Sequence, residues 1–119
     1  CCLENAEYLV ADQSEDLIKR YDSSGNLLAS LKRKETGFGD LYIITFSQTY
    51  GIFASDHWSS RILHLDSSLN IQGIYGNSGK RTGQFNRVGW MDTRDDLLAV
   101  ADMCNNRIQF FDIKKTLSS

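Results

Sequence analysis

The sequence predicts an all-β protein built from repeated antiparallel units. The first observation is a hairpin pattern that occurs three times: an apolar strand that ends in aspartate, a polar turn, and a second strand that ends in aspartate. The first aspartates of the copies are Asp12, Asp56 and Asp102, and each is followed ten positions later by the second one. The second observation is the spacing, because the copies lie 44 and then 46 residues apart. A period of about 45 residues with one hairpin in each is typical of the four-stranded blades of a β-propeller.

The strands are predicted from short runs rich in β-branched and aromatic residues, bounded by Gly, Ser, Asn and Asp. Ten strands and the start of one more are expected, at Tyr8–Ala11, Leu17–Tyr21, Leu27–Leu31, Leu41–Phe46, Gly51–Ser55, Arg61–Leu65, Asn70–Tyr75, Val88–Asp92, Leu97–Ala101, Arg107–Phe111 and Lys114–Ser119. The blades are expected at about residues 8–34, 37–76 and 83–119, and only the middle one is whole. A helical protein is disfavoured because no stretch sustains a 3.6-residue apolar period.

The length of 119 residues gives room for about two and a half to three blades, whereas a closed propeller takes about 4–8. We therefore expect a partial propeller that needs the remaining blades or another copy to cover its sheets. The strands support this, because Ile18, Ile62 and Ile108 share one repeat position and Tyr21, Leu65 and Phe111 share another, three residues later. These two positions face opposite sides of a sheet, so both faces are expected to be buried.

The composition limits the partners and the cellular compartment that are expected for the chain. The net charge of −2 is too small to create an overall electrostatic field that would attract nucleic acid or a membrane surface. No apolar run is long enough to cross a bilayer, so no membrane partner is expected. The three cysteines do not form a disulfide framework, which favours a reducing compartment and a cytoplasmic location.

The third copy carries a longer pattern, which consists of Gly83-Gln-Phe85, a short strand at Gly89–Asp92, and then Val100-Ala-Asp-Met-Cys-Asn-Asn-Arg-Ile-Gln-Phe-Phe-Asp112. This pattern resembles the NHL repeat. The middle copy keeps Asp56, Arg61, Ile62 and Asp66, and the first copy has Leu17 in place of the arginine. The resemblance covers residues 9 to 112 and departs from the family at Val88, where proline is usual.

The resemblance implies a non-enzymatic interaction module. NHL propellers are best known from tripartite-motif ubiquitin ligases and Brat-like translational repressors, where they bind RNA or protein partners. Ligase activity would lie in a RING domain, which this chain does not contain. The alternative is an enzymatic NHL-like propeller such as the metal-dependent peptidyl-hydroxyglycine lyase. Phe53-Ala-Ser-Asp56 also faintly resembles the signature of low-density-receptor-type propellers, which would imply secretion.

No catalytic group of residues is recognisable, and no cofactor or metal site is expected. Asp12, Asp56 and Asp102 are interpreted as structural caps of their turns, because a carboxylate at a turn accepts backbone N–H groups. Arg61 and Arg107 begin the facing strands, so ion pairs with Asp56 and Asp102 are plausible. His57 and His64 lack neighbouring ligands for a metal. The glycine-spaced segment from Gly76 to Phe85 is predicted to be a flexible loop between blades.

The candidate binding residues come from loops that share one rim of a propeller. This candidate rim consists of Lys32, Arg33, Lys34, His57, Trp58, Arg61, Lys80, Arg81 and Arg107. Cations beside an aromatic ring suit a phosphate backbone with a stacked base. The alternative is an ordinary charged surface with Trp58 packed between blades. Four acidic residues dilute the positive potential of the same rim: Glu15, Asp16, Glu35 and Asp40.

Overall fold

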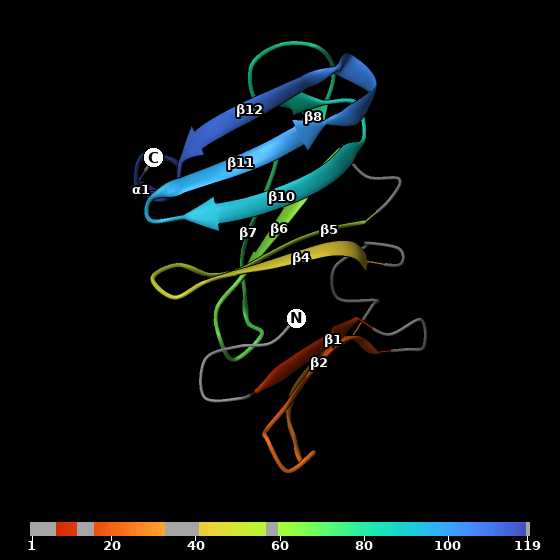
Figure 1. Ribbon diagram of the computed structural model, residues 1–119, viewed down its shortest axis with the longest axis vertical. Helices are drawn as coiled ribbons and strands as arrows, with labels where there is room; N and C mark the ends of the chain where they lie inside the picture. Colours follow the sequence, from red (N-terminus) through yellow and green to blue (C-terminus); the bar gives the residue numbers. More distant parts are fainter. Residues whose placement is uncertain (1–6, 12–15, 33–40, 57–59, 119) are drawn as a thin grey trace.

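Three antiparallel sheets are stacked along the long axis of the molecule (Figure 1). The computed structural model describes residues 7–11, 16–32, 41–56 and 60–118. The strands are β1 Tyr8–Ala11, β2 Asp16–Tyr21, β3 Leu27–Lys32, β4 Leu41–Ser47, β5 Gly51–Asp56, β6 Ile62–Leu65, β7 Ile71–Tyr75, β8 Asn77–Ser78, β9 Gln84–Phe85, β10 Val88–Arg94, β11 Leu97–Asp102 and β12 Arg107–Asp112. The first sheet is β1-β2-β3, the middle sheet β4-β5-β6-β7 and the third sheet β10-β11-β12. The expected all-β class is therefore confirmed.

The repeated hairpin has the same strand register in all three sheets. Tyr8 pairs with Tyr21 in the first sheet, Ile52 with Leu65 in the middle sheet, and Leu98 with Phe111 in the third. These pairs occupy equivalent positions of the sequence repeat. A one-residue slip would turn every side chain of a strand to the other face, so a shared register means that equivalent positions face equivalent directions.

The middle sheet is buried on both faces, as the alternation in its strands predicts. On one face, Leu63 and Leu65 of β6 belong to a core shared with Leu9, Ile18 and Leu31 of the first sheet. On the other face, Ile43, Phe53 and Ile62 of the middle sheet share a core with residues of the third sheet and of the segments on either side of it: Phe85, Val88, Met91, Leu98, Val100 and Ile113. All four residues of β6 are buried in consequence.

Polar contacts also fasten the sheets to one another. Arg20 of β2 donates to the carbonyl oxygen of Ser67, in the turn between β6 and β7. The Thr93 hydroxyl of β10 donates to the Phe46 carbonyl oxygen of β4 at 3.1 Å. The Tyr50 hydroxyl donates to Asp96 Oδ1 at 2.6 Å, and this hydrogen bond raises the pKa of Tyr50 to about 12.

The chain after Asp112 differs from the sequence prediction. Ile113–Ser118 forms a short helix, α1, and not the start of a fourth strand. Asp112 Oδ1 accepts the backbone N–H of Lys115 at 3.1 Å, which is the hydrogen bond of a helix N-cap. Ile113 is buried in the core between the middle and third sheets. A capping aspartate and an apolar anchor thus favour a helical turn here.

Smaller differences lie in the connections. The polar turn after Asp102 contains a single turn of 3-10 helix, η2 Met103–Asn105. β6 begins at Ile62 and not at Arg61. The glycine-spaced segment contains β8 and β9, which pair with each other in parallel. Ile108 is 63% exposed, so the burial expected on both faces does not extend to the outer face of the third sheet.

Candidate interaction rim

Five residues of the candidate rim lie in the described part of the chain: Lys32, Arg61, Lys80, Arg81 and Arg107. Arg33, Lys34, His57 and Trp58 lie outside the described residues, as does the predicted cap Asp12. Asp56 ends β5 opposite Leu41, just as Asp102 ends β11 opposite Val88. The two aspartates therefore occupy equivalent backbone positions, as the repeat predicts.

Asp102 is fully buried at the end of β11 and accepts hydrogen bonds from several groups. Its Oδ1 accepts the backbone N–H of Asn86 at 2.7 Å. Its Oδ2 accepts Asn105 Nδ2 at 2.9 Å and Arg107 Nε at 2.8 Å, the latter as an ion pair, while Gln109 Nε2 is more distant at 3.3 Å. The expected ion pair between Asp102 and Arg107 is thus present.

The prediction that Asp102 caps its own turn through backbone N–H groups is wrong. Its side chain makes no capping hydrogen bond to the start of η2, and the backbone N–H that it accepts belongs to Asn86, before β10. Burial raises the pKa of the Asp102 carboxyl, but the hydrogen bonds from Asn105, Asn86 and Arg107 outweigh burial, so the pKa lies below its usual range. Asp102 stays ionised and joins the third hairpin to the segment before β10.

The partners of Asp102 also hold the segment from Gly79 to Phe85. Arg107 Nη2 donates to the carbonyl oxygens of Arg81 at 2.9 Å and Gln84 at 3.0 Å. Asn105 Nδ2 donates to the Gly79 carbonyl oxygen at 2.9 Å. Gln109 donates through Nε2 to the Gln84 carbonyl oxygen at 2.8 Å and accepts the Gly83 N–H at 3.0 Å. The segment predicted to be a flexible loop is therefore fixed to β12 by side-chain hydrogen bonds.

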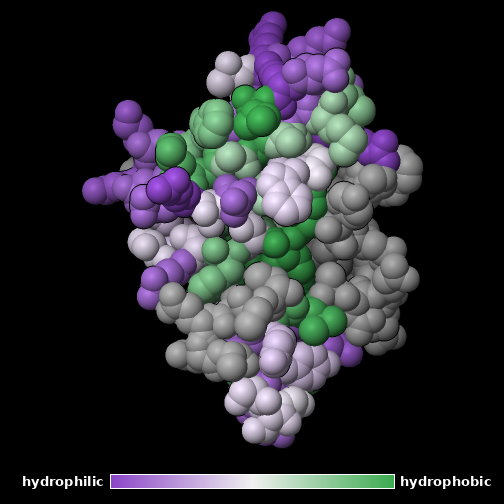
Figure 2. Space-filling model, viewed as in Figure 1, coloured by the Kyte–Doolittle hydropathy of each residue, from purple (hydrophilic) through white to green (hydrophobic). Residues whose placement is uncertain are grey.

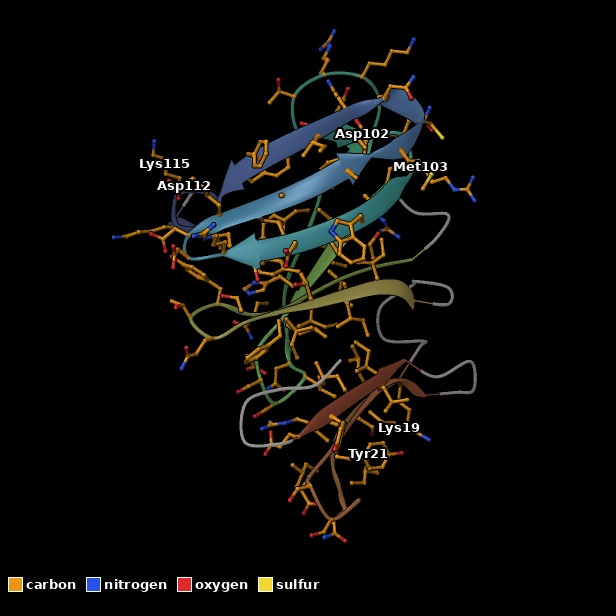
Figure 3. The ribbon with its side chains drawn as sticks, viewed as in Figure 1. Lys19, Tyr21, Asp102, Met103, Asp112 and Lys115 are labelled. Carbon is orange, nitrogen blue, oxygen red and sulfur yellow. The ribbon has the colours of Figure 1, made fainter. Side chains whose placement is uncertain are left out.

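This network divides the basic residues into two kinds. Arg107 is committed to Asp102 and to two carbonyl oxygens, and only about a third of its side chain is exposed, 32%. The side chains of Lys80 and Arg81 are exposed on the fixed segment. Arg81 takes part in the network through its backbone carbonyl oxygen and not through its guanidinium. Asp102 and Met103 lie at the end of the third sheet near this segment, while Asp112 and Lys115 lie at the opposite end (Figure 3).

Two further rim residues lie at equivalent ends of the other sheets. Arg61 precedes β6, whose first residue Ile62 pairs with Tyr75, so Arg61 lies beside the point where the Gly76 segment leaves the middle sheet. Its carbonyl oxygen accepts the Ser55 hydroxyl at 3.1 Å. Lys32 ends β3 opposite Asp16 in the first sheet. Both side chains are exposed, and each has an interaction within the chain.

Turn clamps at Asp22 and Asp66 were not anticipated from the sequence. Each Oδ1 accepts two backbone N–H groups at 2.9 Å, from Ser24 and Asn26 in the first turn and from Ser68 and Asn70 in the second. Each Oδ2 accepts the Asn side chain at 3.1 Å. The signal was present as Asp-Ser-Ser-x-Asn at 22–26 and 66–70. The third copy lacks this pattern and continues into α1.

A buried histidine and an apolar cavity lie between the middle and third sheets. His64 stacks on Phe53 with ring centroids 4.6 Å apart, and its Nε2 donates to the Tyr50 carbonyl oxygen at 2.6 Å. A cavity of about 240 Å³ lies nearby, lined by Phe53, Ile62, Tyr75, Gly76, Gly83, Phe85, Leu98, Phe111 and Ile113. His64 is thus a residue of the core and not part of the rim.

No protein-family model matches the chain, and no curated protein matches it. Among the described residues, no three His, Cys, Asp or Glu side chains are grouped so that they could hold a metal ion. The described helices include none that is both long and apolar enough to cross a bilayer.

Proposed function

We propose that the chain is part of an NHL-type β-propeller that acts as a non-enzymatic interaction module, and that its rim binds single-stranded RNA. Three features support a propeller: the sheets are antiparallel, they stack face to face, and they repeat one hairpin register. The blades would be residues 8–34, 37–76 and 83–119. A protein partner at the same rim is the other version of this proposal.

The observation that carries the RNA version is the way Lys80 and Arg81 are presented. The network around Asp102 fixes their backbone while their side chains remain exposed. A fixed pair of cations loses less conformational freedom on binding a phosphate backbone than the same pair on a mobile loop. Trp58, which lies outside the described residues, would supply the aromatic ring on which an RNA base stacks. Arg107 is a positioning residue in this proposal, because its guanidinium is already bonded to Asp102 and to carbonyl oxygens.

The test is a double substitution, Lys80→Ala with Arg81→Ala, measured by fluorescence anisotropy with single-stranded RNA oligonucleotides at several salt concentrations. Affinity should fall for all sequences, and the slope of log K against log salt should flatten by about 0.7 for each lost phosphate contact. The matched control is Lys114→Ala with Lys115→Ala. It removes the same charge from the opposite end of the third sheet and should leave the slope unchanged.

Both double variants must unfold cooperatively at the wild-type denaturant midpoint before binding is compared. If the folded Lys80/Arg81 variant binds RNA with wild-type affinity and salt slope, RNA binding at this rim is wrong, and recognition of a protein partner becomes the better account. Equal losses in both variants would show that the chain responds only to net charge.

A further inference from the structure

The outer face of the third sheet is apolar and exposed. Register places Trp90, Ala101 and Ile108 in one row across the sheet, and Asp92, Ala99 and Phe110 in the next. Trp90 and Ile108 are each 63% exposed and Phe110 is 67% exposed. Figure 2 shows this face toward the viewer, with green and white surface over β10–β12 and purple surface at its margins. Aromatic and aliphatic side chains grouped on one exposed face mark an interaction surface.

The same face is covered in the two preceding sheets. Ile18 and Ile62 occupy the repeat position of Ile108, and both are buried. Ile18 belongs to the core between the first and middle sheets, and Ile62 to the core between the middle and third sheets. The outer face of the third sheet therefore repeats a surface that, twice in this molecule, packs against the next sheet.

The complementary surface is exposed at the other end of the stack. Tyr8 and Val10 of β1 are 48% and 43% exposed, and Leu28 of β3 is 48% exposed. Their repeat equivalents Ile52 and Ala54 are fully buried against the first sheet, and Val100 is fully buried against the middle sheet. The outer face of the first sheet is thus the surface that, in the other two sheets, receives the preceding sheet.

We propose that the outer face of the third sheet packs against the outer face of the first sheet in a second copy of this chain. The contact would continue the two sheet-on-sheet interfaces already present within the molecule, with equivalent positions on each side. The interface is heterologous, so copies join head to tail. It uses sheet faces and not the rim, and it does not depend on RNA binding.

The first measurement is sedimentation velocity of the chain over a wide range of concentration. We expect the mass to exceed that of one chain, 13.5 kDa, and to rise with concentration. Two variants block one face each: Ile108→Lys with Phe110→Lys on the third sheet, and Tyr8→Lys with Val10→Lys on the first. Because each variant keeps one good face, each alone should be monomeric, and an equimolar mixture should form a dimer and nothing larger.

The matched control is Ile74→Lys on β7, which replaces another exposed apolar side chain, 41% exposed, on neither outer face. It should associate like the wild type. Ile108→Thr with Phe110→Thr serves as the third-sheet variant if the lysine pair does not fold. A wild-type chain that stays monomeric at all concentrations overturns the proposal. So does a mixture of the two blocked variants that does not dimerise, or a control that dissociates as they do.

Discussion

At the scale of single residues, Asp102 is the acceptor on which the hydrogen bonds at the end of the third sheet converge. It is a buried carboxylate whose partners come from the segment before β10, from η2 and from β12. Replacing it by alanine removes the acceptor of Arg107 Nε and of the Asn86 N–H. Breaking a buried ion pair in this way costs about 3–5 kcal/mol, and we expect the lower end because Arg107 is partly exposed.

The free energy of unfolding in urea measures this effect. Asp92→Ala is the control, because Asp92 is exposed on the same sheet and its Oδ1 accepts the N–H of the adjacent Thr93. Its unfolding free energy should change by no more than about 0.5 kcal/mol. If the two substitutions cost the same, the network around Asp102 contributes nothing of its own to stability.

The same carboxylates make stability depend on pH. Hydrogen bonds from Asn70 lower the pKa of Asp66, hydrogen bonds from Asn26 lower that of Asp22, and the pKa of Asp102 is also lowered. A carboxyl whose pKa is lower in the folded chain than in the unfolded chain stabilises the fold above its unfolded pKa of about 4. This stabilisation is lost as pH falls through the folded value.

Unfolding free energies measured from pH 7 down to pH 2 should therefore be constant to about pH 5 and then fall. Asp102→Asn should make the remaining dependence shallower, because one of the linked protons is removed. A wild-type stability that rises as the pH falls below 4 would contradict the direction of these pKa shifts.

At the scale of elements, the sequence predicts strands better than it predicts how connections are held. The hairpins follow from alternating apolar residues with turn residues between them, and they lie where expected from Tyr8 to Asp112. The fixed segment before β10 could not be predicted, because Gln109 and Asn105 reach residues about 25 positions away. Local sequence carries no signal for hydrogen bonds of that range.

The end of the third hairpin shows where the repeat misleads. Asp112 shares its repeat position with Asp22 and Asp66, each of which is followed by a strand, and a strand is therefore expected after it. The residues after Asp112, however, do not repeat the pattern that follows Asp22 and Asp66. Asn26 and Asn70 close the first two turns with side-chain hydrogen bonds, whereas Thr116 stands at this position in the third copy. Without the asparagine, the aspartate caps a helix instead.

Two glycines, Gly25 in a turn and Gly51 at the start of β5, allow backbone strain to be separated from steric overlap. Gly25 and Gly51 both have positive φ, +86° and +98°. A Cβ at Gly25 would meet nothing within 4 Å, whereas a Cβ at Gly51 would overlap the carbonyl oxygen of Leu65. Gly25→Ala should cost about 1–2 kcal/mol from left-handed strain alone.

Gly51→Ala should cost more, because the overlapping atom belongs to the backbone of β6 and cannot move without disturbing the pairing of β5 with β6. Chemical denaturation of the two variants side by side gives the comparison. Equal destabilisation would mean that β6 accommodates the methyl group and that only the backbone conformation matters.

At the scale of the whole molecule, the stack is one-dimensional: each end sheet contacts the middle sheet, and the middle sheet contacts both. In such a stack, an end sheet loses one interface when it opens, whereas the middle sheet loses two. Leu63 and Leu65 of β6 are fully buried, and Phe53 of β5 nearly so, while the outer faces of the end sheets expose large apolar side chains. Stability should therefore be highest in the middle sheet.

Hydrogen exchange can test this order and also the proposed contact between copies. At low protein concentration, amides of β5 and β6 should exchange slowest, through global unfolding, and amides of β1–β3 and β12 faster, through local opening. At high concentration, association should slow exchange in the end sheets and leave β5 and β6 almost unchanged, because those strands are already covered on both faces. Uniform protection across the three sheets at low concentration would show that the stack opens only as one unit, against the one-dimensional account.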